Sequence, residues 1–172
     1  MKNYKVLLVF ITLFVCGQST FAQSKKELKK KQHLEEYEAI KTLVEEGRLV
    51  FKVTTMTPYQ GSNTVVIGDG VLIEENFLHV NLPFMGNFHA GYTPSNSSNI
   101  EFSTDDTIFE VIYNDKKQKL KINFEVVHNT EVFTFNMAIY RNGRTNLQVV
   151  SNLRSRMVYD GTVESTPQIA DN

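Results

Sequence analysis

The sequence of residues 132–151, VFTFNMAIYRNGRTNLQVVS, decides the fold class of this chain. Large apolar residues alternate with polar ones on both sides of Asn142-Gly143, which is typical of a β-hairpin. A two-residue turn would pair Met137 with Gln148 and mix apolar with polar partners on one face. One more residue in the loop, with the glycine in a left-handed bulge, pairs Met137 with Leu147 instead. We therefore predict the bulged hairpin.

The alternation with a period of two extends outward from this hairpin through most of the chain. Further strands are expected at 48–58, 64–67, 71–74, 77–82, 100–103, 107–113, 120–128 and 156–164. Glycine, proline and asparagine separate them, as tight turns require. Many short strands with almost no helix after Gly47 predict an α+β, mostly β class. The expected architecture is an antiparallel sheet sandwich or a half-closed barrel with one N-terminal helix.

Residues 23–47 are expected to form that helix. They are rich in lysine, glutamate and leucine, and Gly47 supplies the stop. An apolar stripe recurs at steps of three and four residues. It consists of Leu34, Tyr37, Ile40, Leu43 and Val44. The lysine-rich first turns are expected to be solvated, and the second half is expected to dock on the β domain of residues 48–164. Contact of the lysines with anionic lipid is the alternative. At the other end of the chain, residues 165–172 are expected to form a disordered tail.

Residues 1–22 have the order of a cleavable signal peptide. Two lysines precede an apolar run from Val6 to Val15, and the residues before Gln23 are small at the cleavage positions. The apolar run is about half the ~20 residues that a membrane-spanning helix needs. We therefore expect cleavage after Ala22, a periplasmic or secreted protein, and no transmembrane helix after cleavage.

Cys16 is the only cysteine and lies within the expected signal peptide. Cleavage after Ala22 would leave 150 of the 172 residues, a single domain in size, with neither a disulfide nor a thiol nucleophile. The alternative is a lipoprotein acylated at Cys16, which Val15 disfavours because a small residue is expected before the cysteine. With 18 basic against 19 acidic residues, the chain lacks the basic balance that nucleic-acid binding requires.

No motif in the sequence specifies a reaction. The histidines are His33, His79, His89 and His128. None of them has the spacing of a metal site, so no metal or other cofactor is expected. A hydrolase is the enzymatic alternative, in which Asp105, Asp106 or Glu110 would meet His89 or Tyr92 in space. We leave enzymatic activity open and favour a non-enzymatic protein.

The most unusual segment follows the expected strand 77–82. Pro83 ends the ladder pairing of that strand. Four large side chains then occupy a stretch where polar residues are usual. They are Phe84, Met85, Phe88 and Tyr92. These side chains either plug the end of the sheet, which is the more ordinary arrangement, or line a pocket and form the candidate ligand-binding site.

Short motifs in order along the chain also resemble those of one bacterial family. Leu82-Pro83-Phe84-Met85-Gly86 is similar to a Leu-Pro-Tyr-Phe-Gly signature, with phenylalanine and methionine where the family more often has tyrosine and phenylalanine. The supporting motifs are Arg48-Leu49-Val50-Phe51, Ile100-Glu101-Phe102, Asn142-Gly143, Ser151-Asn152-Leu153-Arg154-Ser155 and Arg156-Met157-Val158-Tyr159-Asp160-Gly161. From about Glu38 to Glu164 the chain resembles the family catalogued as domain of unknown function 4251. The resemblance implies a short exported protein of Gram-negative bacteria and supplies no reaction.

The sequence leads to three hypotheses of function. The favoured one is a non-enzymatic envelope module whose aromatic loop contacts an apolar or glycan ligand or an envelope protein. The second is the small hydrolase that uses loop carboxylates. The third is a structural envelope protein that self-associates through an edge strand.

Overall fold

The computed structural model describes residues 25–67, 70–89, 91 and 98–166. The expected signal peptide with Cys16, the loop residue Tyr92 and most of the expected tail lie outside the described residues.

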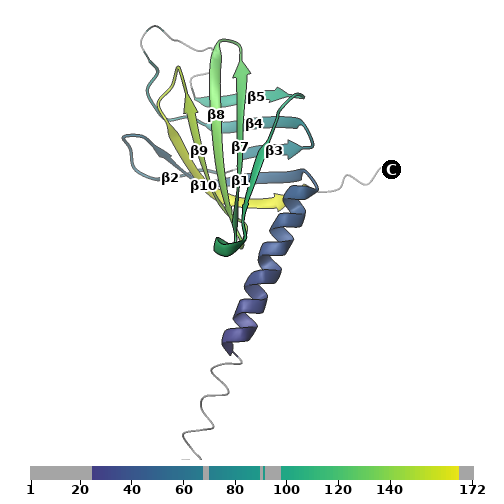
Figure 1. Ribbon diagram of the computed structural model, residues 1–172. Helices are drawn as coiled ribbons and strands as arrows, with labels where there is room; N and C mark the ends of the chain where they lie inside the picture. Colours follow the sequence, from purple (N-terminus) through teal and green to yellow (C-terminus); the bar gives the residue numbers. More distant parts are fainter. Residues whose placement is uncertain (1–24, 68–69, 90, 92–97, 167–172) are drawn as a thin grey trace, which may run out of the picture.

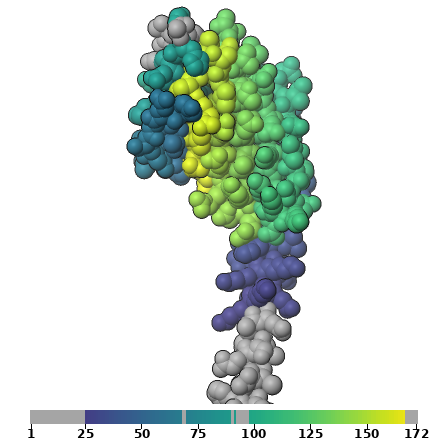
Figure 2. All heavy atoms as spheres, turned by 60° about the vertical axis from the view of Figure 1, so that its left-hand side comes forward, coloured from purple at the N-terminus to yellow at the C-terminus, as the bar shows by residue number. Residues whose placement is uncertain are grey.

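The two halves of the N-terminal helix, described over residues 25–45, have different environments. In the second half, Tyr37 and Val44 are buried and Ile40 packs against the core. The first half extends away from the sheet, as the purple segment shows (Figure 1, Figure 2). This agrees with the predicted docked and solvated halves, except that Leu34 is 51% exposed and does not belong to the buried stripe.

Within the described residues, ten strands form one antiparallel sheet. They are β1 (Arg48–Pro58), β2 (Thr64–Val65), β3 (Gly70–Glu74), β4 (Phe77–Pro83), β5 (Asn99–Thr104), β6 (Glu110–Asn114), β7 (Lys119–His128), β8 (Glu131–Tyr140), β9 (Arg144–Ser151) and β10 (Met157–Ser165). Their order is β5-β4-β3-β1-β10-β9-β8-β7-β6, and the short β2 pairs with β1 beside this path. The predicted antiparallel, mostly β class is confirmed.

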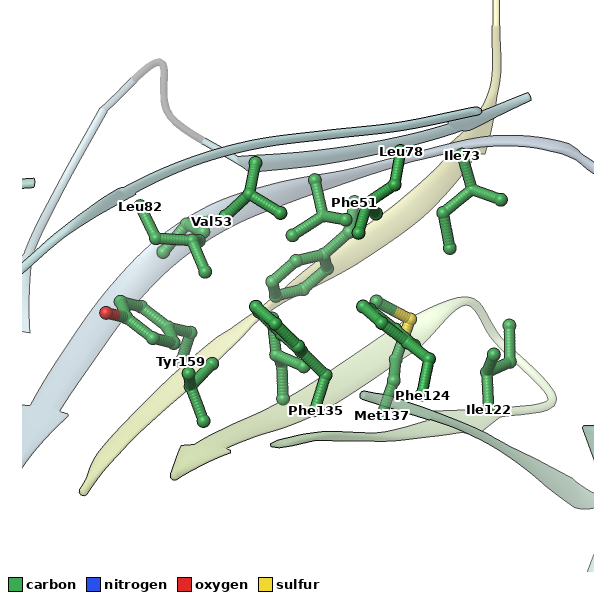
Figure 3. Close-up of a cluster of buried hydrophobic side chains, with 14 of the residues drawn as sticks. Phe51, Val53, Ile73, Leu78, Leu82, Ile122, Phe124, Phe135, Met137 and Tyr159 are labelled. Carbon is green, nitrogen blue, oxygen red and sulfur yellow. The ribbon is translucent and has the colours of Figure 1, made fainter. Parts of the chain in front are cut away.

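The sheet curls so that its two halves enclose one core, and of the two predicted architectures the half-closed barrel is the one observed (Figure 1). Figure 3 shows Phe51 and Leu78 from one half facing Phe124 and Phe135 from the other. The rings of Phe124 and Phe135 stack with centroids 4.6 Å apart. Burial alternates along the strands, so every second side chain enters this core.

A bulge in β1, between Val53 and Thr55, lets this strand coil sharply against β10. At Gly161 of β10, a Cβ atom would lie 1.9 Å from the carbonyl oxygen of Lys52, so only glycine permits this approach. Strict alternation along β1 would place Thr55 in the same row as Val53. The bulge breaks this alternation, because its extra residue makes Met56 the next buried side chain, 4% exposed.

The hairpin of β8 and β9 has the predicted register. Met137 pairs with Leu147 and Phe135 with Val149. Gly143 has a φ of 77°, the left-handed conformation of the expected bulge. The prediction is therefore confirmed, because only this register keeps the apolar row on the core side.

Other strand ends differ from the expected ones. β2 ends at Val65 rather than Ile67, and β6 begins at Glu110 rather than Thr107. The backbone N–H of Thr107 instead donates to the carbonyl of Asn76, 3.2 Å away, which anchors the connection between β5 and β6. The expected turn before β7 is a short 3-10 helix, Asp115–Lys117.

Candidate binding site at the 84–89 loop

A buried ion pair lies beneath the loop that follows β4. Arg154 donates from Nε to both carboxylate oxygens of Glu131, at 2.8 and 3.1 Å. The side chains are only 7% and 3% exposed. A buried charge is costly without partners, so the neighbouring groups determine whether this pair is tolerated.

The neighbouring groups supply hydrogen bonds to both members of this ion pair. The hydroxyl of Ser151 donates to the Glu131 carboxylate, and it accepts the backbone N–H groups of Leu153 and Arg154. Arg154 Nη1 donates to the carbonyl oxygen of Asn99, 3.1 Å away. The pair therefore ties together β5, β8, β9 and the segment that leads into β10.

Three aromatic rings surround the Arg154 guanidinium. Its central carbon lies 5.2 Å from the ring centroids of Phe84 and Phe88 and 5.7 Å from that of Phe133. Phe84 and Phe88 also contact each other, with centroids 5.1 Å apart. Cation–π attraction is strengthened where water is removed, so the loop aromatics stabilise the buried cation.

Backbone hydrogen bonds hold the loop against residues 152–155. The N–H of His89 donates to the carbonyl of Leu153, and the N–H of Ser155 donates to the carbonyl of Asn87, both at 2.9 Å. Phe88 and Arg154 also form an isolated β-bridge. At Gly86 a Cβ atom would lie 2.3 Å from Ser155 Oγ and 2.8 Å from the Phe84 ring, so a larger residue would have to displace these two side chains.

Tyr159 fixes the start of the loop. Its hydroxyl donates to the carbonyl oxygen of Pro83, 2.8 Å away. Burial raises the pKa of Tyr159, so the hydroxyl stays protonated and remains a donor. The loop thus leaves β4 from a fixed point.

A hollow of about 300 Å³ opens on the outer side of this loop. Its lining residues are Pro58, Tyr59, Gln60, Met85, Gly86, Asn87, His89 and Ser155. The two large side chains of the rim are open to solvent, Met85 at 55% and Tyr59 at 62% exposure. The Arg156 guanidinium lies 5.3 Å from the Tyr59 ring centroid and steadies that ring.

The structure separates the four residues chosen from the sequence. Phe84 is 7% exposed and belongs to the core, and Phe88 is partly buried and packs on it. Met85 points to the hollow, while Tyr92 lies outside the described residues. The loop therefore combines the two arrangements considered for it. Phe84 and Phe88 close the end of the sheet, and Met85 lines a hollow.

The residues considered for a hydrolase do not come together in the part of the chain that the structure describes. Asp105 and Asp106 are exposed, and Glu110 accepts a hydrogen bond from Asn123 at 2.9 Å. No hydrogen bond or ion pair joins these carboxylates to His89 among the described residues. Tyr92, the other residue considered, lies outside them.

Sequence reasoning missed Arg154, Glu131 and Tyr59. Glu131 could have been found, because it continues the inward row of Phe133 and Phe135 in β8. An acid in an inward row needs a buried partner. Nothing in the sequence marks Tyr59 as a site residue. It lies in the turn after β1, and this turn meets the 84–89 loop only in the folded protein.

Three of the four histidines contact separate partners rather than a shared site. Arg141 lies 3.2 Å from His33, Ser103 lies 2.8 Å from His79, and His128 stacks on Phe102. Within the described ranges, no three His, Cys, Asp or Glu side chains are grouped as a metal site would need. In the same ranges, no helix is both long and apolar enough to cross a membrane.

Comparison with known proteins places this geometry in a family. The family model described as "Domain of unknown function (DUF4251)" matches residues 31–163. Among solved structures, the chain is similar to the crystal structure of a DUF4251 family protein from Bacteroides eggerthii DSM 20697. The two share 14% identity and a TM-score of 0.53 over 76% of this chain and 87% of the other. No curated protein matches the chain. The resemblance found in the sequence is confirmed, and this chain belongs to the DUF4251 family.

Proposed function

We propose that this protein is a non-enzymatic binding module of the bacterial cell envelope, and that it recognises a glycan at the hollow beside the 84–89 loop. The signal-peptide pattern of residues 1–22 supports export to the periplasm or the outside of the cell. The lipoprotein form through Cys16 is the alternative route to the envelope. The proposed site consists of Met85, Tyr59 and the polar side chains between them.

The observation that carries this proposal is an exposed Met85 next to a buried Phe84. Adjacent residues of one loop thus have opposite roles: Phe84 is fixed under Arg154 and Met85 is presented to solvent. A ligand that binds at Met85 meets a backbone that is already ordered. Binding to an ordered site loses less conformational entropy than binding to a loop that must fold.

The lining of the hollow favours a glycan over a purely apolar ligand. Tyr59 offers a ring face and a hydroxyl, a combination that suits partly polar ligands. Gln60, Asn87 and His89 supply donors and acceptors around it. Hydroxyl-rich sugars with an apolar ring face match this mixture, whereas the carboxylate and base of a hydrolytic centre are not assembled here.

The test is binding of the folded protein to an array of bacterial envelope glycans, including peptidoglycan fragments and lipopolysaccharide core oligosaccharides. We expect Tyr59→Ala to weaken binding by about tenfold, because a stacked ring at a binding site typically contributes more than 1 kcal/mol. Met85→Ala should have a smaller effect in the same direction.

Tyr140→Ala is the matched control. Tyr140 is also exposed, at 45%, but lies on β8 away from the lining of the hollow. Equal loss of binding in Tyr59→Ala and Tyr140→Ala would contradict the assignment of the site. Failure of the unaltered protein to bind any glycan on the array would contradict the ligand class.

A further inference from the structure

A second hollow lies on the outer face of the sheet, away from the loop. It measures about 670 Å³ and runs over β1, β3 and β4 beside β2 and β10. Figure 2 shows the blue segment that contains β1 and β2 standing beside the yellow β10. The outer face of a half-closed sheet is normally polar, so the composition of this groove needs explanation.

The groove is lined mainly by apolar side chains. Val50 and Leu72 form its floor and are only partly exposed, although they lie on the outward row of their strands. Val65 and Ile67 form one rim and are 75% and 90% exposed. Gly70 lies between Lys52 and Asn81 in the sheet register and contributes no side chain, which deepens the floor there.

A charged pair lines the β10 side of the groove, where Val50 and Lys52 pair with Glu164 and Thr162 in the sheet register. Lys52 Nζ lies 2.6 Å from the carboxylate of Glu164, and the two side chains are 60% and 51% exposed. An exposed pair of this kind contributes little to stability, so another carboxylate can replace Glu164 at small cost. His79 and Thr162 add polar groups at the border of the same groove.

We infer that this outer groove binds a fatty acid. The acyl chain would lie along Val50, Leu72, Val65 and Ile67, with the carboxylate at the Lys52 ammonium. The volume is within the ~300–1,000 Å³ typical of small-ligand sites. The four apolar side chains match a single acyl chain, and the carboxylate of a fatty acid would take the place of Glu164 at the Lys52 ammonium. This inference is independent of the glycan proposal, since the two hollows share no lining residue.

Isothermal titration calorimetry with decanoate tests the inference. The unaltered protein should bind it saturably, at about one molecule per chain. Decyltrimethylammonium has the same chain length and the opposite charge, so it should bind more weakly if Lys52 holds the head group. Lys52→Met should weaken decanoate binding and shift the preference toward decyltrimethylammonium, because Glu164 would then be the unpaired charge in the groove.

Val65→Ser/Ile67→Ser tests the apolar rim, and Val127→Ser/Ile108→Ser is its control. All four residues are at least 66% exposed, so neither double variant is expected to disturb the fold. We expect the rim variant to bind decanoate about tenfold more weakly, while the control binds like the unaltered protein. The inference is overturned by absence of saturable decanoate binding, by equal effects of the two double variants, or by a Lys52→Met variant that still prefers decanoate.

Discussion

Two ion pairs of this protein each join a basic side chain to a glutamate, but their surroundings are opposite. Arg154 and Glu131 are 7% and 3% exposed, whereas Lys52 and Glu164 are 60% and 51% exposed. The buried pair is surrounded by hydrogen bonds and aromatic rings and holds the 84–89 loop on the sheet. The exposed pair lies at the border of an apolar groove.

The difference shows how one kind of contact can serve two purposes. A buried pair must keep both partners, because the loss of one leaves an uncompensated charge. An exposed pair is solvated in either state, so its partners can be exchanged. We therefore assign the buried pair to the rigid frame of the protein, meaning the sheet with the 84–89 loop held on it. We assign the exposed pair to binding, because a ligand carboxylate can replace Glu164 beside Lys52. Three further predictions test this contrast, from the largest expected effect to the smallest.

Arg154→Met should destabilise the protein by about 3–5 kcal/mol, because Glu131 would remain buried without its cation. Urea unfolding followed by circular dichroism measures this change. A loss below about 1 kcal/mol would mean that the buried pair contributes no more to stability than an exposed pair does, which would contradict the contrast between the two pairs.

The double variant Glu131→Leu/Arg154→Met controls for this interpretation. It removes both charges, so it should be more stable than Arg154→Met alone. Equal stability of the single and double variants would show that packing around the arginine, rather than its charge, accounts for the loss.

Tyr37 provides an intermediate case, because it is 1% exposed while its partner Asp115 is open to solvent. Burial and the 2.8 Å hydrogen bond to Asp115 raise the pKa of Tyr37 from 10.0 to about 12. The raised pKa favours the neutral phenol in the folded state. Its contribution to stability is complete below pH 10 and is lost as the pH rises toward about 12.

The stability gap between the unaltered protein and Tyr37→Phe should therefore shrink over this alkaline range, by up to about 2 kcal/mol. Urea unfolding of both proteins at a series of pH values measures the gap. A gap that stays constant above pH 10 would mean that Tyr37 titrates alike in the folded and unfolded chain.

Lys52→Gln should change the free energy of unfolding least, by less than about 0.5 kcal/mol. Its small effect should diminish further at high salt, because exposed charges are screened. Thermal unfolding at low and high salt checks both expectations. A loss comparable to that of Arg154→Met would show that Lys52 belongs to the frame rather than to an exchangeable site.

The sequence predicted the fold better than the site. Alternation and turn chemistry are local properties, so the β8–β9 register and the bulge at Gly143 could be derived from neighbouring residues. The bulge at Val53 could not, because it depends on Gly161, which is distant in sequence and adjacent only in the folded sheet.

For the site, the sequence located the unusual loop but not the direction of its side chains. Phe84 and Met85 are both large and apolar, and their sequence does not separate them. The buried Arg154 separates them, because it attracts one ring and leaves the next side chain outside. Tyr59 entered the site only through the meeting of two loops.

By itself, the sequence determined an antiparallel, mostly β domain of the DUF4251 family with one N-terminal helix, because period, turn residues and motif order are written along the chain. Tertiary structure alone decided that Arg154 meets Glu131, that Met85 borders a hollow, and that Val50 and Leu72 line an outer groove. These are contacts between distant segments. They follow from how the sheet curls, and curling depends on bulges and close backbone approaches that only the folded chain brings together.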